Sequence, residues 1–180
     1  VSATKQFYHC FGCGASGDAI KFLMEHDHLT FIEALSKLAQ YANLELPENT
    51  KKNDASYNLF LLNKKAAQFY SSYLMSNRKA LEYLSDRNID KQMIEVFNIG
   101  LSNDSWDDLS KLFAKSKEVS SGLEAGLLIK SNNKVYDRFR NRIIFPIRNS
   151  SGNYIGFGGR VYNSDEGAKY INSPETKLFH

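Results

Sequence analysis

The chain has 180 residues, which is enough for one or two domains with a hydrophobic core. Its residues are 42% hydrophobic and 24% charged, as in globular domains, and no apolar run approaches the roughly 20 residues of a membrane span. The N-terminus lacks the apolar core of a signal peptide. We therefore expect no helical membrane span in this chain, and no signal peptide is visible in it.

The net charge of +3 is unevenly distributed. Residues 1–50 hold three Lys/Arg and six Asp/Glu, whereas residues 127–180 hold nine Lys/Arg and four Asp/Glu. This asymmetry is typical of a chain in which one end meets a polyanion. The chain begins with Val1 and stops at His180 just after a motif, so we expect it to be a piece of a longer protein.

Both cysteines of the chain lie near its start, in the segment Phe7-Tyr-His-Cys10-Phe-Gly-Cys13-Gly. A Cys-x2-Cys pair on a tight glycine turn is a common half of a tetrahedral zinc site. The flanking residues favour a zinc-ribbon hairpin, while a redox pair or two unbound thiols are the alternatives. His9 should point to the opposite face of its strand, and His26 and His28 follow a helix, so none of the three is an evident further ligand.

Two helices follow. The first is predicted over residues 18–25, with Ser16-Gly17 as its start signal. The second begins at Thr30, which forms a capping-box pattern with Glu33, and Pro47 is expected to end it. Residues 47–56 are polar and aperiodic, which predicts a linker between domains.

The apolar pattern of residues 57–126 predicts a helical region. We expect helices over residues 57–77, 78–86, 90–97 and 120–125, and one more after a capping-box-like start at residues 105–108. Asn88 falls where a left-handed residue is needed after a helix. Residues 97–101 are predicted to form a short strand.

From Leu127 onward the sequence is typical of β-structure. Strands are predicted over residues 127–130, 142–148 and 154–162, with turns at Asn132-Asn133 and at residues 150–153. Arginines recur inside these apolar strands. An arginine held on a rigid sheet can bind phosphate well, because its planar guanidinium matches the phosphate oxygens. The alternative is a sheet edge with ordinary salt bridges, and Asp137 in particular is expected to pair with Arg138.

Three motifs of this region resemble the bacterial DnaG-type DNA primases. They are Arg138-Phe-Arg140-x-Arg142-Ile-Ile-Phe-Pro-Ile-Arg148, Ile155-Gly-Phe-Gly-Gly-Arg160-Val and Lys169-Tyr-x-Asn172-Ser-Pro-Glu-Thr. The resemblance covers about forty positions nearly without gaps and falls in the amino-terminal part of that family's RNA polymerase domain. Residues 7–14 are similar to the second half of the family's zinc motif.

The resemblance implies roles for particular residues. Zinc would be held by Cys10 and Cys13 as half of a site, the other half being an upstream Cys-x2-His pair in that family. Template DNA would lie in a shallow basic groove formed by Arg87, Trp106, Arg138, Arg140, Arg160, Lys169 and Asn172. The Mg²⁺-binding catalytic acids of the family belong to a Toprim domain expected after His180, so no catalytic residue is expected here.

The sequence thus predicts an α+β chain with three parts. These are the end of a zinc-binding domain (1–46), a linker (47–56) and the N-terminal subdomain of a primase RNA polymerase domain (57–180). The resemblance implies a cytoplasmic bacterial enzyme that makes short RNA primers on single-stranded DNA at the replication fork. Its expected partners are the replicative helicase and single-strand-binding protein. A non-catalytic single-stranded-DNA-binding accessory module and a zinc-ribbon transcription regulator are the alternatives.

Overall fold

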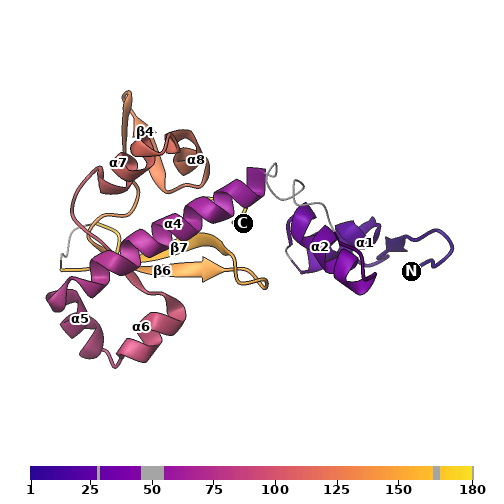
Figure 1. The fold of residues 1–180 in the computed structure, drawn as a ribbon, viewed down its shortest axis with the longest axis horizontal. Coiled ribbons are helices and arrows are strands. Elements are labelled where there is room, and N and C mark those ends of the chain that lie inside the picture. Colours follow the sequence, from indigo (N-terminus) through magenta and orange to yellow (C-terminus); the bar gives the residue numbers. More distant parts are fainter. Residues whose placement is uncertain (28, 46–54, 164–166, 180) are drawn as a thin grey trace. The chain divides into compact units, whose positions relative to one another are not determined.

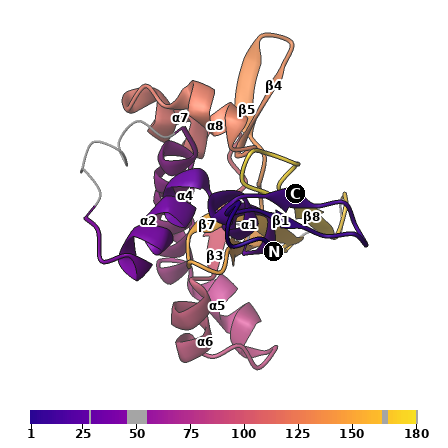
Figure 2. The same cartoon turned by 90° about the vertical axis from the view of Figure 1, so that its right-hand side faces the viewer.

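The computed structural model describes residues 1–27, 29–45, 55–163 and 167–179. The chain forms two compact units, Val1–Asn58 with Asn149–Gly152, and Leu59–Arg148 with Asn153–His180. Helices and strands are mixed throughout (Figures 1 and 2), which confirms the predicted α+β class. No helix in these described ranges has the length and apolar character needed to cross a membrane.

The first unit contains a short hairpin and two helices. Strands β1 (Tyr8–His9) and β2 (Ser16–Gly17) are antiparallel, and helices α1 (Ala19–His26) and α2 (Phe31–Tyr41) follow. The predicted capping box is confirmed: the Thr30 hydroxyl accepts from the backbone N–H of Glu33, whose carboxylate accepts from the backbone N–H of Thr30. Helix α2 ends at Tyr41, earlier than predicted. Pro47 and linker residues 47–54 lie outside the described residues.

A long helix, α4 (Ala55–Met75), leads into the second unit, which starts at Leu59. The helix includes the last two residues of the predicted linker. It is followed by α5 (Arg78–Ser85) and α6 (Lys91–Phe97). Asn88 has φ of +60°, as predicted. The strand predicted over residues 97–101 is wrong at its start, because α6 runs to Phe97 and a left-handed Asn98 turns the chain into β3 (Gly100–Ser102).

The main sheet has four antiparallel strands in the order β3-β6-β7-β8. Its long strands are β6 (Arg142–Arg148) and β7 (Tyr154–Val161), and β8 (Tyr170–Asn172) forms one edge. A separate hairpin pairs β4 (Leu128–Ser131) with β5 (Lys134–Asp137). Its turn residues Asn132 and Asn133 have φ of +48° and +60°, as a tight hairpin turn requires.

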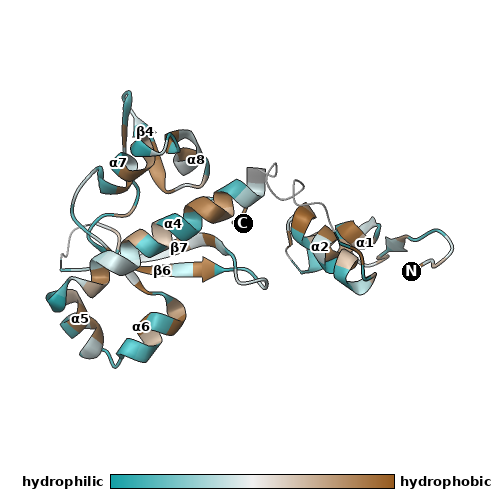
Figure 3. Cartoon of the chain, viewed as in Figure 1, coloured by the Kyte–Doolittle hydropathy of each residue, from teal (hydrophilic) through white to brown (hydrophobic). Residues whose placement is uncertain are grey.

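Helices cover both faces of the main sheet. Helix α4, along which hydrophobic and hydrophilic residues alternate in Figure 3, packs Tyr70 against Phe157 and forms a core with Ile144 on one face. On the other face, Leu84 and Ile94 of α5 and α6 pack with Ile143. Because strands alternate their side chains, the residues opposite Ile143 on β7 and β8 belong to this second face.

Helix α7 (Asp108–Lys115) starts differently from the prediction. No side chain near its start provides the expected cap, so the capping-box interpretation of residues 105–108 is wrong. Instead the Asp137 carboxylate, at the end of β5, accepts from the backbone N–H groups of Leu109 and Ser110 at 2.8 Å each. The last helix is α8 (Val119–Glu124), followed by Gly126 with φ of +68°. Asp137 thus caps α7 from a strand that is distant in sequence.

Candidate nucleic-acid interface

A basic pocket of about 630 Å³ lies at one end of the main sheet. Three of the predicted DNA-binding residues, Arg87, Arg160 and Lys169, line it. Arg87 follows α5, Arg160 is near the end of β7, and Lys169 precedes β8. The backbone N–H of Val161 donates to the Lys169 carbonyl at 2.9 Å, which holds the two strand ends together. The pocket is completed by Tyr83, Val161, Asn163 and Gly167.

Aromatic rings restrain the arginines of this pocket. The Arg87 guanidinium carbon lies 3.7 Å from the ring centroid of Tyr83, whose carbonyl accepts a hydrogen bond from Arg87 at 3.2 Å. The Tyr83 ring meets the Tyr162 ring edge-on at 5.1 Å. Arg160 lies 5.6 Å from the ring of Tyr170, its cross-strand partner. Such contacts occupy the face of the guanidinium and limit the freedom of the side chain, but they leave the N–H groups at its edge available for hydrogen bonds to a ligand.

A second cluster combines Trp106, Arg140 and Tyr136. The Arg140 guanidinium carbon lies 3.7 Å from the Trp106 ring centroid, and the Trp106 and Tyr136 rings are 5.5 Å apart. Arg140 also donates to the Asp137 carbonyl at 2.8 Å. The side chain of Trp106 is nevertheless 60% exposed. An exposed indole braced by a cation is a surface on which a nucleic-acid base can stack.

Both clusters occupy the same end of the sheet. The backbone N–H of Tyr162 donates to the Asn141 carbonyl at 2.9 Å, and these residues adjoin the pocket residue Asn163 and the stacked Arg140. Asn172 is exposed on β8, opposite Gly158 and two residues from Tyr170, so both side chains share one face of the strand. The structure thus brings Arg87, Trp106, Arg140, Arg160 and Lys169 to one end of the sheet, with Asn172 farther along its edge strand.

Arg138 is placed differently. Its side chain is half-buried, and desolvation lowers the pKa of its guanidinium. Within the part of the chain that the structure describes, its Nε atom is buried without a hydrogen-bond partner. Its backbone N–H donates to the Leu127 carbonyl.

The sheet arginines are not salt-bridged in the described ranges. The ion pairs found there join other groups, for example Arg78 with Glu82 and Lys177 with Glu124. None involves a predicted DNA-binding residue, and the expected pair between Asp137 and Arg138 is wrong because Asp137 is engaged by α7.

Asp137 connects this surface to the core. Burial outweighs the two backbone N–H hydrogen bonds and raises the pKa of its carboxyl group from 3.8 to about 6. Its own backbone N–H donates to the Trp106 carbonyl at 2.8 Å, while its carbonyl holds Arg140. Sequence reasoning missed this role, and it also missed Tyr83, whose position four residues before Arg87 was the available signal.

The cysteine hairpin of the first unit fits half of a zinc site. Cys10 and Cys13 are exposed on the turn between β1 and β2, where the backbone N–H of Gly14 donates to the Cys10 carbonyl. The backbone N–H groups of Cys13 and Gly12 hold the pKa of the Cys10 thiol below its usual value. Among the described residues no group of three or more possible metal ligands occurs. His9 packs edge-on against Phe11, and His28 lies outside the description.

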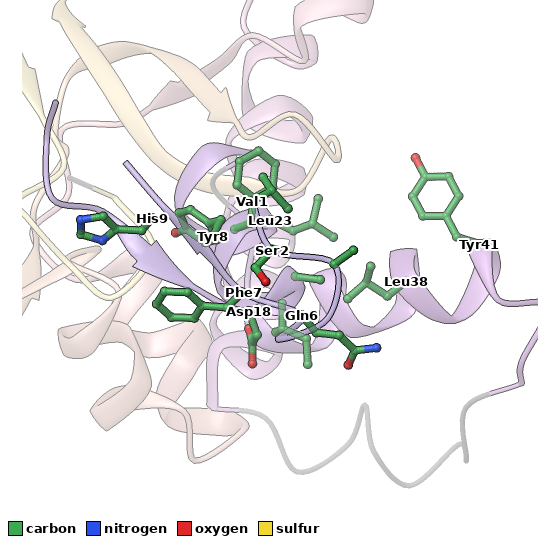
Figure 4. Close-up of a pocket in the computed structure, with 14 residues that line it drawn as sticks. Val1, Ser2, Gln6, Phe7, Tyr8, His9, Asp18, Leu23, Leu38 and Tyr41 are labelled. Atoms are coloured by element: carbon green, nitrogen blue, oxygen red, sulfur yellow. The ribbon is translucent and has the colours of Figure 1, made fainter. Parts of the chain in front are cut away.

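An apolar hollow of about 750 Å³ also lies in the first unit (Figure 4). Figure 4 shows Phe7, Tyr8 and His9 of the hairpin segment on one side and Leu38 and Tyr41 of α2 on the other. Its lining contains Asp18 but none of the predicted site residues.

The comparisons with known proteins agree with this fold. Residues 69–180 match the family described as "DNA primase catalytic core, N-terminal domain", and residues 1–54 match the CHC2 zinc finger. The fold, together with the basic pocket and aromatic rings at one end of its sheet, therefore defines the class of protein. It is a primase-type catalytic-core subdomain joined to a zinc-finger unit. The chain belongs to the bacterial DnaG-type DNA primase family.

Individual relatives are close over the whole chain. It is 45% identical over 191 residues to the DNA primase of Haemophilus influenzae, covering 100% of this chain and 32% of that protein. The chain thus spans about a third of the length of such relatives. The structure of the Aquifex aeolicus primase zinc-binding and RNA polymerase domains matches with a TM-score of 0.66 at 33% identity, covering 100% of this chain and 44% of that one. A DnaG catalytic domain bound to ssDNA matches with a TM-score of 0.65 at 38% identity, covering 70% and 42%.

Proposed function

We propose that this chain is the template-gripping part of a bacterial replicative primase. The whole enzyme, a nucleotidyltransferase of the DNA-directed RNA polymerase type, would synthesise short RNA primers on single-stranded DNA. Family membership supports the activity, and the related catalytic domain solved with ssDNA supports the substrate. The proposed site is the cytoplasmic replication fork, with the replicative helicase and single-strand-binding protein as partners of the whole enzyme.

The observation that carries this proposal is the basic pocket with its aromatic flanks. Three cations line it, no described carboxylate does, and exposed Trp106 and Tyr170 lie at the same end of the sheet. Cations grip the phosphate backbone, while exposed rings stack with bases of any sequence. We assign DNA contacts to Arg87, Trp106, Arg138, Arg140, Arg160, Lys169 and Asn172. Arg138 would need to turn outward to take part, because its Nε atom is buried.

Metal ions have separate proposed roles. Cys10 and Cys13 would supply two of the four thiolate or imidazole ligands that a structural zinc requires, which agrees with the zinc-finger match. Zinc there would tie the hairpin to the segment that supplies the other ligands. We assign Mg²⁺ to the Toprim domain of the whole enzyme by family resemblance, and to no residue of this chain.

The chain is expected to bind single-stranded DNA weakly and with little sequence preference. Each phosphate contact on a single strand adds about 0.7 to the slope of log K against log salt, so four contacts by Arg138, Arg140, Arg160 and Lys169 give a slope of roughly −3. Arg160→Ala should lower affinity for all sequences alike and flatten the slope by about one contact. Fluorescence anisotropy with a labelled oligonucleotide over a salt series measures both.

Arg78→Ala is the matched control for that experiment. Arg78 is an exposed arginine of the same unit, but it is paired with Glu82 and lies outside the pocket. It should leave the salt slope unchanged. If Arg160→Ala behaves like Arg78→Ala, the basic pocket does not hold DNA and the proposal is wrong.

Zinc binding by this chain alone is expected to be weak. Only two ligands are evident among the described residues, and losing half of a site removes most of the roughly 10–16 kcal/mol typical of structural zinc. Dialysis against a mild chelator, followed by metal analysis, tests this. Stoichiometric zinc that survives dialysis and is lost in His9→Ala would show that a histidine completes the site.

A further inference from the structure

Arg142, at the start of β6, is a buried arginine outside the proposed set of DNA contacts. Its residue is only 9% exposed. Its guanidinium donates to three backbone carbonyls, those of Ala168 at 2.9 Å, Gly159 at 3.3 Å and Lys169 at 3.5 Å. Its guanidinium therefore points at the backbone of β7 and of the segment just before β8, and is not directed into solvent.

Burying the Arg142 guanidinium costs free energy of desolvation, which its hydrogen bonds must offset. Within the ranges that the structure describes, no carboxylate pairs with Arg142, and desolvation lowers the pKa of its guanidinium. A buried cation must recover its lost hydration from hydrogen bonds, here to carbonyl oxygens. Gly159 provides the space, since a Cβ there would lie 3.0 Å from Arg142 Cδ and 2.8 Å from Phe139 Cδ1.

The carbonyls that Arg142 holds flank two pocket cations. Gly159 directly precedes Arg160 on β7, and Ala168 and Lys169 lead into β8. One planar guanidinium therefore spans the two chain segments that present Arg160 and Lys169 to the pocket. A lysine could not replace it, because a single ammonium lacks the planar fork that reaches the carbonyls of both segments.

We propose that Arg142 is a positioning residue that sets the spacing between Arg160 and Lys169, so that both can contact phosphate oxygens of one bound strand. The inference rests on the proposed function and deepens it. Arg142 does not itself touch the phosphate, since its donors are turned to carbonyl groups. Its contribution to binding therefore passes through Lys169 and Arg160.

A double-mutant cycle on the 180-residue chain tests this with a labelled oligothymidylate. Arg142→Gln should lower affinity in the wild-type background and have little further effect in the Lys169→Ala background, a departure from additivity of at least about twofold. Arg142→Lys keeps the charge but should bind as poorly as Arg142→Gln. Arg148→Gln, an exposed arginine of the same strand, is the control and should combine additively with Lys169→Ala.

Each other outcome overturns the proposal. Additive losses, or full affinity in Arg142→Lys, would show that Arg142 acts through its charge alone. If circular dichroism shows that both Arg142 variants fail to fold, the residue serves the fold and not the spacing of the pocket. If the wild-type chain binds no oligothymidylate, the proposed function is wrong as well. If folded Arg142 variants bind normally, only the role proposed for Arg142 is wrong.

Discussion

Asp137→Ala is expected to reduce the free energy of unfolding by roughly 2–6 kcal/mol at pH 5. The change leaves the backbone N–H groups of Leu109 and Ser110 buried without the carboxyl oxygens that now accept from them. Each buried donor that loses its partner costs about 1–3 kcal/mol. Urea unfolding followed by circular dichroism measures the loss.

The size of this loss should depend on pH in a defined direction. The pKa of Asp137 is raised from 3.8 to about 6, so the folded chain binds a proton more tightly than the unfolded chain. The stability linked to that proton is present below the ordinary pKa and is lost as pH rises through 6. At about 1.4 kcal/mol per pKa unit, the wild-type chain should lose roughly 1 kcal/mol of this stability between pH 5 and 7. The difference between wild type and Asp137→Ala should shrink by that amount.

Asp104→Asn is the control, because Asp104 is an exposed carboxylate in the loop before α7. It should leave the free energy of unfolding nearly unchanged. Carboxyl groups with lowered pKa, such as Asp27 and Asp107, titrate below this pH window and do not disturb it. An Asp137→Ala loss that grows from pH 5 to pH 7 would contradict the prediction, since it would mean that the ionised form is favoured by folding.

Local sequence rules predicted the elements that depend on near neighbours. The capping box at Thr30, the left-handed Asn88 and the Asn132-Asn133 turn follow from interactions within four residues, and all three are confirmed. The predicted start of α7 failed because its cap comes from Asp137, 28 residues from Leu109 in the sequence. No local pattern contains that contact.

The candidate site shows the same division. Charge and motif identified Arg87, Arg160 and Lys169, which the structure brings to one pocket. They could not show that the Nε atom of Arg138 is buried while Arg140 stacks on Trp106, because both arginines belong to one strand-like motif. Arg142 belongs to it too, yet it turns inward to backbone carbonyls. Which arginines of such a motif face solvent depends on strand register and on the close packing at Gly159.

Trp106→Ala is expected to have the largest effect of any single aromatic change on DNA binding. Stacking of one base on an aromatic ring is worth about 1–3 kcal/mol, which corresponds to a loss of roughly 5-fold to 150-fold in affinity. The salt slope should stay as it is, because no charge is removed and Arg140 keeps its hydrogen bond to the Asp137 carbonyl. Trp106→Phe should retain most of the affinity.

The contrast with Arg160→Ala separates the two kinds of contact that we propose. The arginine change should lower both affinity and salt slope, whereas the tryptophan change should lower affinity alone. Phe97→Ala is the matched control, since Phe97 is 62% exposed on α6, away from both clusters, and should bind as the wild type does. Trp106 is 60% exposed, so its loss should change the unfolding midpoint little. A folded Trp106→Ala chain with wild-type affinity would show that the indole serves only to brace Arg140, and that DNA is held at this end of the sheet by its cations.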